Sequence, residues 1–239
     1  MRPLPPPIVE MHDGILVVRD DLLPGGTKLR YLRSLFADHD EVVYASPVFG
    51  GAQLALAHAA KATGKKATLF VAKRKIMHPR TASAEAVGAR IIQVEHGYLS
   101  HVQARAKMYC QVSGAHYLPF GGDGEEAVEA IAAAARMVWN DVGPFDEVWS
   151  AMGSGVLQRG LQRGMPGVKR FFGIMVGGET KNPGIAVPIP AGMPFEKAFR
   201  PQPPFPSDPF YDAKAWAACV RAHAPGALFW NVLGPPPGI

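Results

Sequence analysis

Short apolar runs and longer amphipathic stretches alternate along the chain. The short runs are rich in β-branched and aromatic residues and predict strands; they cover residues 15–18, 41–45, 67–72, 90–94, 116–119, 147–152, 170–176 and 227–232. The longer stretches predict helices over residues 28–36, 52–63, 83–87, 99–113, 125–142, 156–163 and 212–223. Strands that alternate with helices form parallel βαβ units, so the pattern indicates an α/β protein with two lobes.

Two parts of this pattern are less regular. Residues 178–210 show weak periodicity, and no element is predicted there. Many of the 23 prolines cluster within residues 3–7, 201–206 and 235–237, where they predict stiff surface segments that join neither a helix interior nor a strand ladder. Elsewhere glycine marks the ends of elements; Gly64 is expected to close the helix that ends at Thr63.

Composition narrows the classes of protein. The 239 residues are 48% hydrophobic and 19% charged, which is typical of a globular protein and excludes a disordered one. The net charge of +5 favours anionic partners. Basic residues are spread along the chain, and the short basic run within 61–75 is interpreted as a solvated face rather than as a nucleic-acid footprint.

The remaining compositional signals concern location. Cys110 and Cys219 form neither a zinc spacing nor a disulfide framework, which favours a reducing compartment. The N-terminus has no apolar segment after a basic start, and no apolar run reaches membrane-spanning length. We therefore expect a soluble, cytoplasmic protein without a signal peptide or a membrane span.

Candidate chemistry lies in three loops that follow predicted strands, because ligands of open parallel sheets bind at the carboxyl ends of strands. The first loop contains Gly25, Gly26, Thr27 and Lys28. Thr27 is a candidate N-cap, which places Lys28 at a helix N-terminus, where partial positive charge disfavours a protonated amine. The pKa of Lys28 is therefore expected to be lowered, which suits an amine that attacks an aldehyde. By itself, this loop favours the plainer interpretation of a surface lysine.

Glycines also mark the other two loops. Gly153, Ser154 and Gly155 follow a strand and open a helix, so their N–H groups and the serine hydroxyl could cradle a phosphate. This segment is neither a Walker A loop nor a complete dinucleotide-binding fingerprint, and a plain tight turn is the alternative. The loop 46–53 contains glycines that allow a backbone to approach a ligand closely, and a structural turn explains it equally well.

Taken in order, these segments resemble the fold-type II pyridoxal-phosphate (PLP) enzymes, the tryptophan synthase β-like group. Within that group the chain is most similar to the branch that contains 1-aminocyclopropane-1-carboxylate deaminase and D-cysteine desulfhydrase. The segments that carry the resemblance are Val18-Arg19-Asp20-Asp21, Gly25-Gly26-Thr27-Lys28-Leu29-Arg30, Gly153-Ser154-Gly155-Val156-Leu157-Gln158-Arg159-Gly160-Leu161, Asp208-Pro209-Phe210-Tyr211-Asp212-Ala213-Lys214-Ala215 and Leu228-Phe229-Trp230-Asn231-Val232-Leu233-Gly234. The resemblance implies a two-lobed α/β fold of parallel-type sheets flanked by helices. Residues 1–37 and 121–239 would form the larger, PLP-binding lobe, and residues 38–120 the smaller lobe.

The resemblance also implies roles for single residues. Lys28 matches the lysine that forms a Schiff base with PLP and moves protons. The turn Gly153-Ser154-Gly155 matches the loop that binds the cofactor phosphate. Tyr211 matches a tyrosine that lies near the substrate. Asp212 matches a glutamate that contacts the pyridine nitrogen and strengthens the electron sink; a charge placed at a helix N-terminus would explain Asp212 equally well.

The chain departs from the family where a substrate carboxylate would bind. The family's Ser-Asn pair appears here as Gly50 and Gly51, so only backbone amides and Gln53 remain to contact substrate and cofactor. Leu157 replaces the threonine of the phosphate loop, and the chain is shorter than is usual for the branch. We therefore expect a different and bulkier substrate than the cyclopropane amino acid.

Three functions follow from these observations. The first is a PLP-dependent lyase or deaminase, by resemblance a homodimer, that removes an α-proton from a small amino-acid-like substrate held through a Lys28 Schiff base. The second is a compact, phage-type lyase that acts on amino-acid-modified thymidine in DNA, such as glycyl thymidine, which the basic charge would suit. The third is a non-catalytic protein of the PLP fold that binds nucleic acid or a protein partner; Lys28, Ser154, Tyr211 and Asp212 argue against it.

Overall fold

The computed structural model describes residues 4–95, 97–178, 180 and 182–236, and the chain divides into two compact units. Unit 1 consists of Pro24–Gly122, and unit 2 combines residues 4–23 with Asp123–Pro235. The sequence-based division set the first boundary after residue 37. In the structure residues 24–37 belong to unit 1, because α1 (Leu29–Leu32) packs against α2 (Ala52–Thr63).

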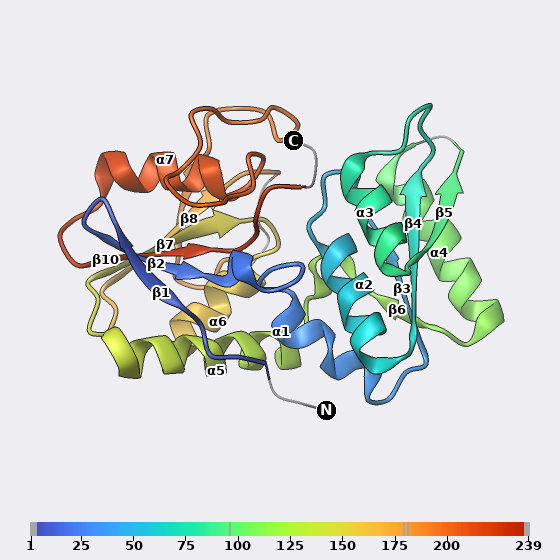
Figure 1. Cartoon of the computed structure of the whole chain (residues 1–239), viewed down its shortest axis with the longest axis horizontal. Helices are drawn as coiled ribbons and strands as arrows, with labels where there is room; N and C mark the ends of the chain where they lie inside the picture. Colours follow the sequence, from blue (N-terminus) through green and yellow to red (C-terminus); the bar gives the residue numbers. More distant parts are fainter. Residues whose placement is uncertain (1–3, 96, 179, 181, 237–239) are drawn as a thin grey trace. The chain divides into compact units, whose positions relative to one another are not determined.

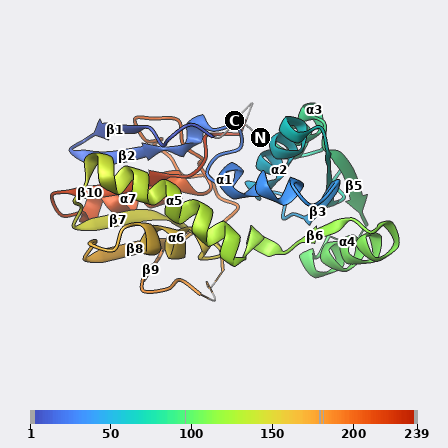
Figure 2. The same cartoon turned by 90° about the horizontal axis from the view of Figure 1, so that it is seen from below.

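A six-stranded sheet forms the centre of unit 2 (Figure 1). Its order is β1-β2-β10-β7-β8-β9, and every neighbouring pair is parallel except β1 with β2. The strands are β1 (Val9–His12), β2 (Ile15–Arg19), β7 (Glu147–Met152), β8 (Arg170–Met175), β9 (Val187–Pro190) and β10 (Ala227–Asn231). Helix α7 (Asp212–Ala222) covers one face, while α5 (Glu125–Val142) and α6 (Val156–Gly164) lie side by side on the other (Figures 1 and 2).

Unit 1 contains a four-stranded, fully parallel sheet in the order β5-β4-β3-β6. Its strands are β3 (Glu41–Ala45), β4 (Lys66–Ala72), β5 (Arg90–Val94) and β6 (His116–Leu118). Helices α2 and α3 (Pro79–Val87) lie on one face and α4 (Leu99–Ser113) on the other (Figure 1). Short 3₁₀ turns complete the chain at η1 (Asp20–Leu22), η2 (Ser34–Phe36) and η3 (Phe120–Gly122).

Burial on both faces explains the continuous apolar strands of unit 2. Phe229 on β10 lies in register with Val17 on β2 and with Trp149 on β7, and all three are buried. On the α7 face, Phe229 and Trp216 form an edge-to-face pair with ring centroids 5.3 Å apart. Strands covered on both sides read as unbroken hydrophobic runs, which is why the sequence shows them clearly.

Glycines set the close packing of the two helices on the opposite face. A Cβ atom at Gly160 would lie 2.4 Å from Cγ2 of Ile131, and one at Gly164 would lie 2.4 Å from Cβ of Ala135. Real Cβ atoms do not approach so closely, so α6 can pack against α5 at this distance only because both positions are glycine.

The sequence located most elements correctly. Every predicted strand is present with its ends within one residue, and α2, α4 and α5 have the predicted bounds. Gly64 adopts the left-handed conformation as the C-cap of α2, as expected. The parallel α/β fold with helices on both sides of each sheet is confirmed. No helix among the described residues is both long and apolar enough to cross a lipid bilayer.

Three details of the prediction are wrong. The helix expected over 28–36 is split into α1 and η2, and α3 begins at Pro79 rather than at residue 83 because proline is well suited to a first helical position. Strands β1 and β9 were missed. Strand β9 contains Pro188 and Pro190 and lies at the sheet edge, where a missing N–H donor is tolerated.

Candidate cofactor site

Lys28 follows a turn that requires glycine. Gly25 and Gly26 both have positive φ angles, of 87° and 78°. A Cβ atom at Gly25 would lie 2.4 Å from the backbone Cα of Ala55, so the turn packs directly against α2. The turn therefore fixes where the chain enters α1, and with it the backbone position of Lys28.

The start of α1 differs from the sequence prediction. The N-cap is Lys28 and no side chain caps the helix, so the predicted N-cap at Thr27 is wrong. The first turn is closed by the backbone instead, because the carbonyl groups of Gly26 and Thr27 accept the N–H groups of Leu29 and Arg30 at 2.9 and 3.0 Å.

Two oxygen atoms orient the amine of Lys28. Its Nζ donates to the hydroxyl of Tyr31 at 3.1 Å and to the carbonyl of Gly121 at 3.4 Å. The Tyr31 hydroxyl in turn donates to the same Gly121 carbonyl at 2.9 Å. A Cβ atom at Gly122 would lie 2.8 Å from the Tyr31 ring, so glycine is required beside it as well. Sequence reasoning missed both residues: Gly121 lies 93 positions from Lys28 and shares no local pattern with it, whereas Tyr31, three positions on, could have been found from helical spacing.

The pKa of Lys28 moves in the direction opposite to the sequence prediction. Burial lowers the pKa of the amine, but Tyr31 and Tyr44 raise it by more, and the net pKa lies above its ordinary value. The expected lowering is wrong because α1 has only four residues, too few aligned peptide dipoles to dominate the amine. Once its amine is free, a raised pKa makes Lys28 a stronger base.

The loop 46–53 holds its own side chains inward. The side-chain amide of Gln53 donates to the carbonyl groups of Pro47 and Val48, both at 3.1 Å, and its oxygen accepts from Thr81 at 2.8 Å. Gln53 is fully buried. Its polar atoms thus support the loop, and its contact with a cofactor stays a prediction. Gly50 and Gly51, predicted with Gln53 to bind the cofactor, have no side chains, and the N–H group of Gly50 already donates to the Pro47 carbonyl at 2.9 Å.

The turn Gly153-Ser154-Gly155 connects β7 to α6 as predicted. Gly155 is the N-cap of α6, with a φ of 86°. The first N–H groups of a helix have no acceptor within the helix and lie at its positive end, so they favour a phosphate. A Cβ atom at Gly153 would lie 3.7 Å from the Tyr211 hydroxyl. The structure therefore brings the predicted phosphate turn and Tyr211 together within unit 2.

A residue from the unpredicted segment supports this turn. The hydroxyl of Thr180 donates to the carbonyl of Gly153 at 2.9 Å. A Cβ atom at Gly155 would lie 2.2 Å from the carbonyl oxygen of Asn182, so the chain around residue 180 lies directly over the turn. No sequence signal indicated Thr180, because residues 178–210 lack periodicity.

We expect Thr180→Val to weaken PLP binding. The substitution keeps the shape but removes the hydroxyl that fixes Gly153, and one hydrogen bond of about 0.5–1.5 kcal/mol corresponds to roughly a 2- to 10-fold higher Kd. Absorbance titration with PLP measures the change. Thr63→Val is the matched control, because the Thr63 hydroxyl donates to carbonyl groups within α2. Equal effects of both substitutions would contradict a role for Thr180.

Asp212 anchors the end of the last strand of unit 2. It is the first residue of α7 and fully buried, and its two carboxyl oxygens accept the N–H groups of Val232 and Leu233 at 3.0 and 3.2 Å. Burial, together with the charges of Asp208 and Asp21, raises the pKa of Asp212 well above its ordinary value, although the two N–H groups lower it. The contact of Asp212 with a pyridine nitrogen stays a prediction.

The raised pKa of Asp212 predicts a pH dependence of stability. The native protein holds this proton more tightly than the unfolded chain, so the free energy of unfolding should fall as pH rises from about 3.8 through the raised native pKa. Each unit of pKa difference contributes about 1.4 kcal/mol. Asp212→Asn should flatten this part of the curve, as urea unfolding at a series of pH values would show. Asp141→Asn, at an exposed position, should leave the slope unchanged; a wild-type slope in Asp212→Asn would refute the assignment.

Comparisons with known proteins identify the family and the fold. Residues 4–192 match the family model described as pyridoxal-phosphate dependent enzyme. The chain therefore belongs to the family of pyridoxal-phosphate dependent enzymes, and its cofactor is PLP. No curated protein sequence matches the chain.

Solved structures show the same fold at low identity. An ACC deaminase homologue is 20% identical with a TM-score of 0.78, covering 92% of this chain and 84% of that one. Cysteine synthase from Entamoeba histolytica is 14% identical with a TM-score of 0.74, covering 98% and 86%. Diaminopropionate ammonia lyase from Escherichia coli, in apo form, is 14% identical with a TM-score of 0.67, covering 92% and 77%. The chain thus has the fold of type II PLP enzymes.

The residues present fit this cofactor. The amine of Lys28 is held by two oxygens and is the group able to condense with an aldehyde. The turn at 153–155 combines a helix N-terminus with glycines that leave room beside the Tyr211 hydroxyl. An imine-forming amine and an anion-binding turn are the two features that PLP requires of a protein.

Proposed function

We propose that the protein is a PLP-dependent lyase or deaminase for substrates with a primary amino group and a hydrogen on the adjacent carbon. The observation that carries this proposal is the amine of Lys28, oriented by Tyr31 and Gly121 in a chain of the PLP-dependent family. The ACC deaminase homologue and the ammonia lyase among the similar structures support this reaction class.

Each residue has a defined task in this proposal. PLP, when bound, supplies the electron sink that stabilises negative charge on the substrate carbon. Lys28 holds the cofactor and, once the substrate amine displaces it, its Nζ takes the proton from that carbon. Tyr31 and Gly121 then stabilise the ammonium group that results, because both place oxygens against Nζ. The turn 153–155 binds the phosphate, and the Tyr211 hydroxyl borders the reacting part of the substrate.

The loop 46–53 defines the substrate class further. Its one amide side chain, that of Gln53, is fully engaged by the carbonyls of Pro47 and Val48 and by the hydroxyl of Thr81. A free carboxylate would therefore find no free amide side chain in this loop, and the N–H group of Gly50 already donates to the Pro47 carbonyl at 2.9 Å. This arrangement favours an amine whose neighbouring carboxyl group is absent, modified or bound through backbone contacts alone.

Absorbance spectroscopy tests the proposal. Protein purified with PLP should be yellow, borohydride should fix the cofactor on Lys28 in a peptide map, and candidate amines should shift the spectrum and release ammonia or another small product. A colourless protein that binds DNA with strong salt dependence would instead indicate the non-catalytic binding protein. A coloured protein inert toward every amine would reject the lyase assignment.

A second candidate substrate is amino-acid-modified thymidine in DNA. The side chains of loop 46–53 favour it because they offer no charged or free amide group to a free carboxylate, and the net charge of +5 suits a polyanion. Incubation with glycine-modified DNA and, separately, with free D-cysteine distinguishes the two. Product from D-cysteine alone would eliminate the DNA substrate.

A further inference from the structure

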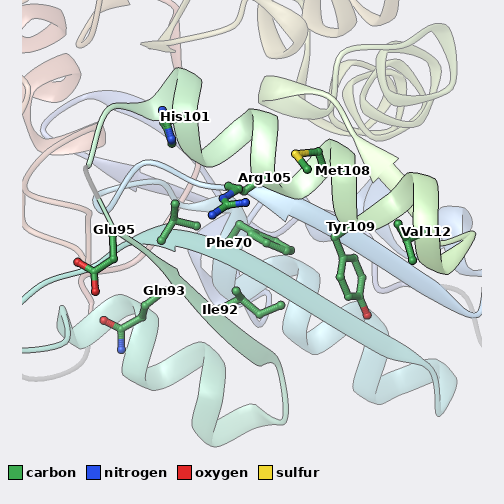
Figure 3. Close-up of a pocket in the computed structure, with 10 residues that line it drawn as sticks. Phe70, Ile92, Gln93, Glu95, His101, Arg105, Met108, Tyr109 and Val112 are labelled. Atoms are coloured by element: carbon green, nitrogen blue, oxygen red, sulfur yellow. The ribbon is translucent and has the colours of Figure 1, made fainter.

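A groove of about 600 Å³ runs between β5 and α4 in unit 1, apart from every residue assigned to the cofactor (Figure 3). Its floor and walls are mostly apolar. The lining includes Phe70, Ile92, Glu95, Arg105, Met108 and Val112. Concave apolar surfaces of this size with a few polar groups are typical of binding sites.

The strand beside this groove is a sheet edge with little protection. Strand β5 is the first strand of its sheet and, within the described residues, pairs only with β4. Its sequence, from Arg90 to Val94, contains two isoleucines and a valine; only the first residue, Arg90, is charged, and residues 91–94 contain neither a charge nor a proline. Natural proteins usually protect an edge with charge, proline or a bulge. The free N–H and C=O groups of β5 therefore offer a template for another strand.

Helix α4, on the other side of the groove from β5, also presents exposed side chains to a ligand. His101, Arg105, Met108 and Val112 share one stripe of α4, and Figure 3 shows side chains of this stripe along the groove. Met108 is 55% and Val112 91% exposed, so both present apolar surface beside the groove. In the part of the chain that the structure describes, Arg105 makes no ion pair or side-chain hydrogen bond.

We propose that this groove binds an extended peptide segment of a protein partner, which adds to the sheet as a strand next to β5. Apolar side chains on one face of the segment would cover Ile92, Met108 and Val112, and an acidic residue would pair with Arg105. Charge complementarity favours this partner over a second copy of the chain. Two-fold pairing of β5 with itself would place the α4 helices of both copies on the same face, with Arg105 and His101 of each turned toward like groups.

Hydrogen exchange with a synthetic peptide tests this inference on the full-length, PLP-loaded protein. The probe is an acetylated heptapeptide with valine at positions 1, 3 and 7, glutamate at position 5 and threonine between them, so that the valines and the glutamate share one face of the strand. Binding should slow exchange of the amides in Arg90–Val94, because they gain hydrogen-bond partners. The same peptide with lysine in place of glutamate should bind at least about tenfold more weakly, because the charge pairing with Arg105 is reversed.

Matched substitutions at exposed positions of α4 separate the groove from general charge. Arg105→Glu and Val112→Asp should each weaken binding of the glutamate peptide by about tenfold or more, whereas Lys107→Glu, which makes the same charge change outside the groove lining, should alter it less than about twofold at physiological salt. The inference is overturned if the glutamate peptide does not bind at millimolar concentration, or binds without protecting β5. It is equally overturned if sedimentation shows a dimer that Val112→Asp dissociates and the peptide does not, since a second copy then occupies the groove.

Discussion

Lys28→Ala should abolish the yellow cofactor adduct and lower turnover by about 10³-fold or more, because one substitution removes both the imine-forming amine and the proton acceptor. The fold should survive. Lys28 is half-buried, and the hydrogen bond between Tyr31 and Gly121 persists without it. The loss of stability should therefore be about 1 kcal/mol. Absorbance of the PLP-loaded protein, single-turnover kinetics and thermal unfolding measure the three quantities.

Lys214 provides the discriminating control for this prediction. Unlike the half-buried Lys28, it is buried, with 3% of its surface exposed, and burial lowers the pKa of its amine. By pKa alone it would be the better nucleophile. Its Nζ, however, donates to the carbonyl groups of Pro194 and Phe195 at 2.8 and 3.0 Å, which indicates a structural role. Lys214→Met should lose stability by about 1–3 kcal/mol and keep its colour. A colourless Lys214→Met beside a yellow Lys28→Ala would show that Lys214 forms the imine and that Lys28 has the structural role.

Gly155→Ala should weaken PLP binding by about 30-fold or more and destabilise unit 2. The φ of 86° costs an L-residue roughly 1–2 kcal/mol. The added Cβ would also lie 2.2 Å from the carbonyl oxygen of Asn182, a backbone atom that cannot rotate away, and overpacking of this kind costs about 1–3 kcal/mol. In the Gly155→Ala variant, the turn 153–155 and the segment around Thr180 must therefore move apart. PLP titration and urea unfolding report the two effects.

Gly114→Ala separates conformational strain from steric conflict. Gly114 has a similar φ of 74°, but nothing lies within 4 Å of the position that a Cβ atom would occupy. This variant should lose only the conformational part, about 1 kcal/mol, and should bind PLP as the wild type does. If Gly155→Ala behaves in the same way as Gly114→Ala, the close approach of Asn182 does not matter for the phosphate turn.

Local signals account for the parts of the site that the sequence predicted. The turn 153–155 is recognisable because a buried strand, two glycines and a helix follow one another directly, and Lys28 because it follows Gly25 and Gly26. Such features depend on residues within a few positions of each other, where backbone preference and periodicity act. The family resemblance added the order of these pieces along the chain.

Long-range contacts account for what the sequence did not predict. Thr180 lies 27 positions from Gly153, and Gly121 lies 93 positions from Lys28, so neither contact leaves a local pattern. The upward direction of the Lys28 pKa follows from Tyr31 and Tyr44 and not from its place at a helix start. The inward-facing amide of Gln53 depends on Thr81 from another helix.

The sequence by itself determined the alternation of strands and helices, the parallel α/β class, the place of Lys28 after a glycine turn and the place of the turn 153–155 between a strand and a helix. Tertiary structure alone decided which groups surround Lys28 and this turn, namely the oxygens that hold the Lys28 amine and the threonine over Gly153. It also decided that the edge of β5 is exposed beside Arg105. The physical reason is that secondary structure follows from neighbours along the chain, whereas charge, burial and hydrogen bonding at a site follow from neighbours in space.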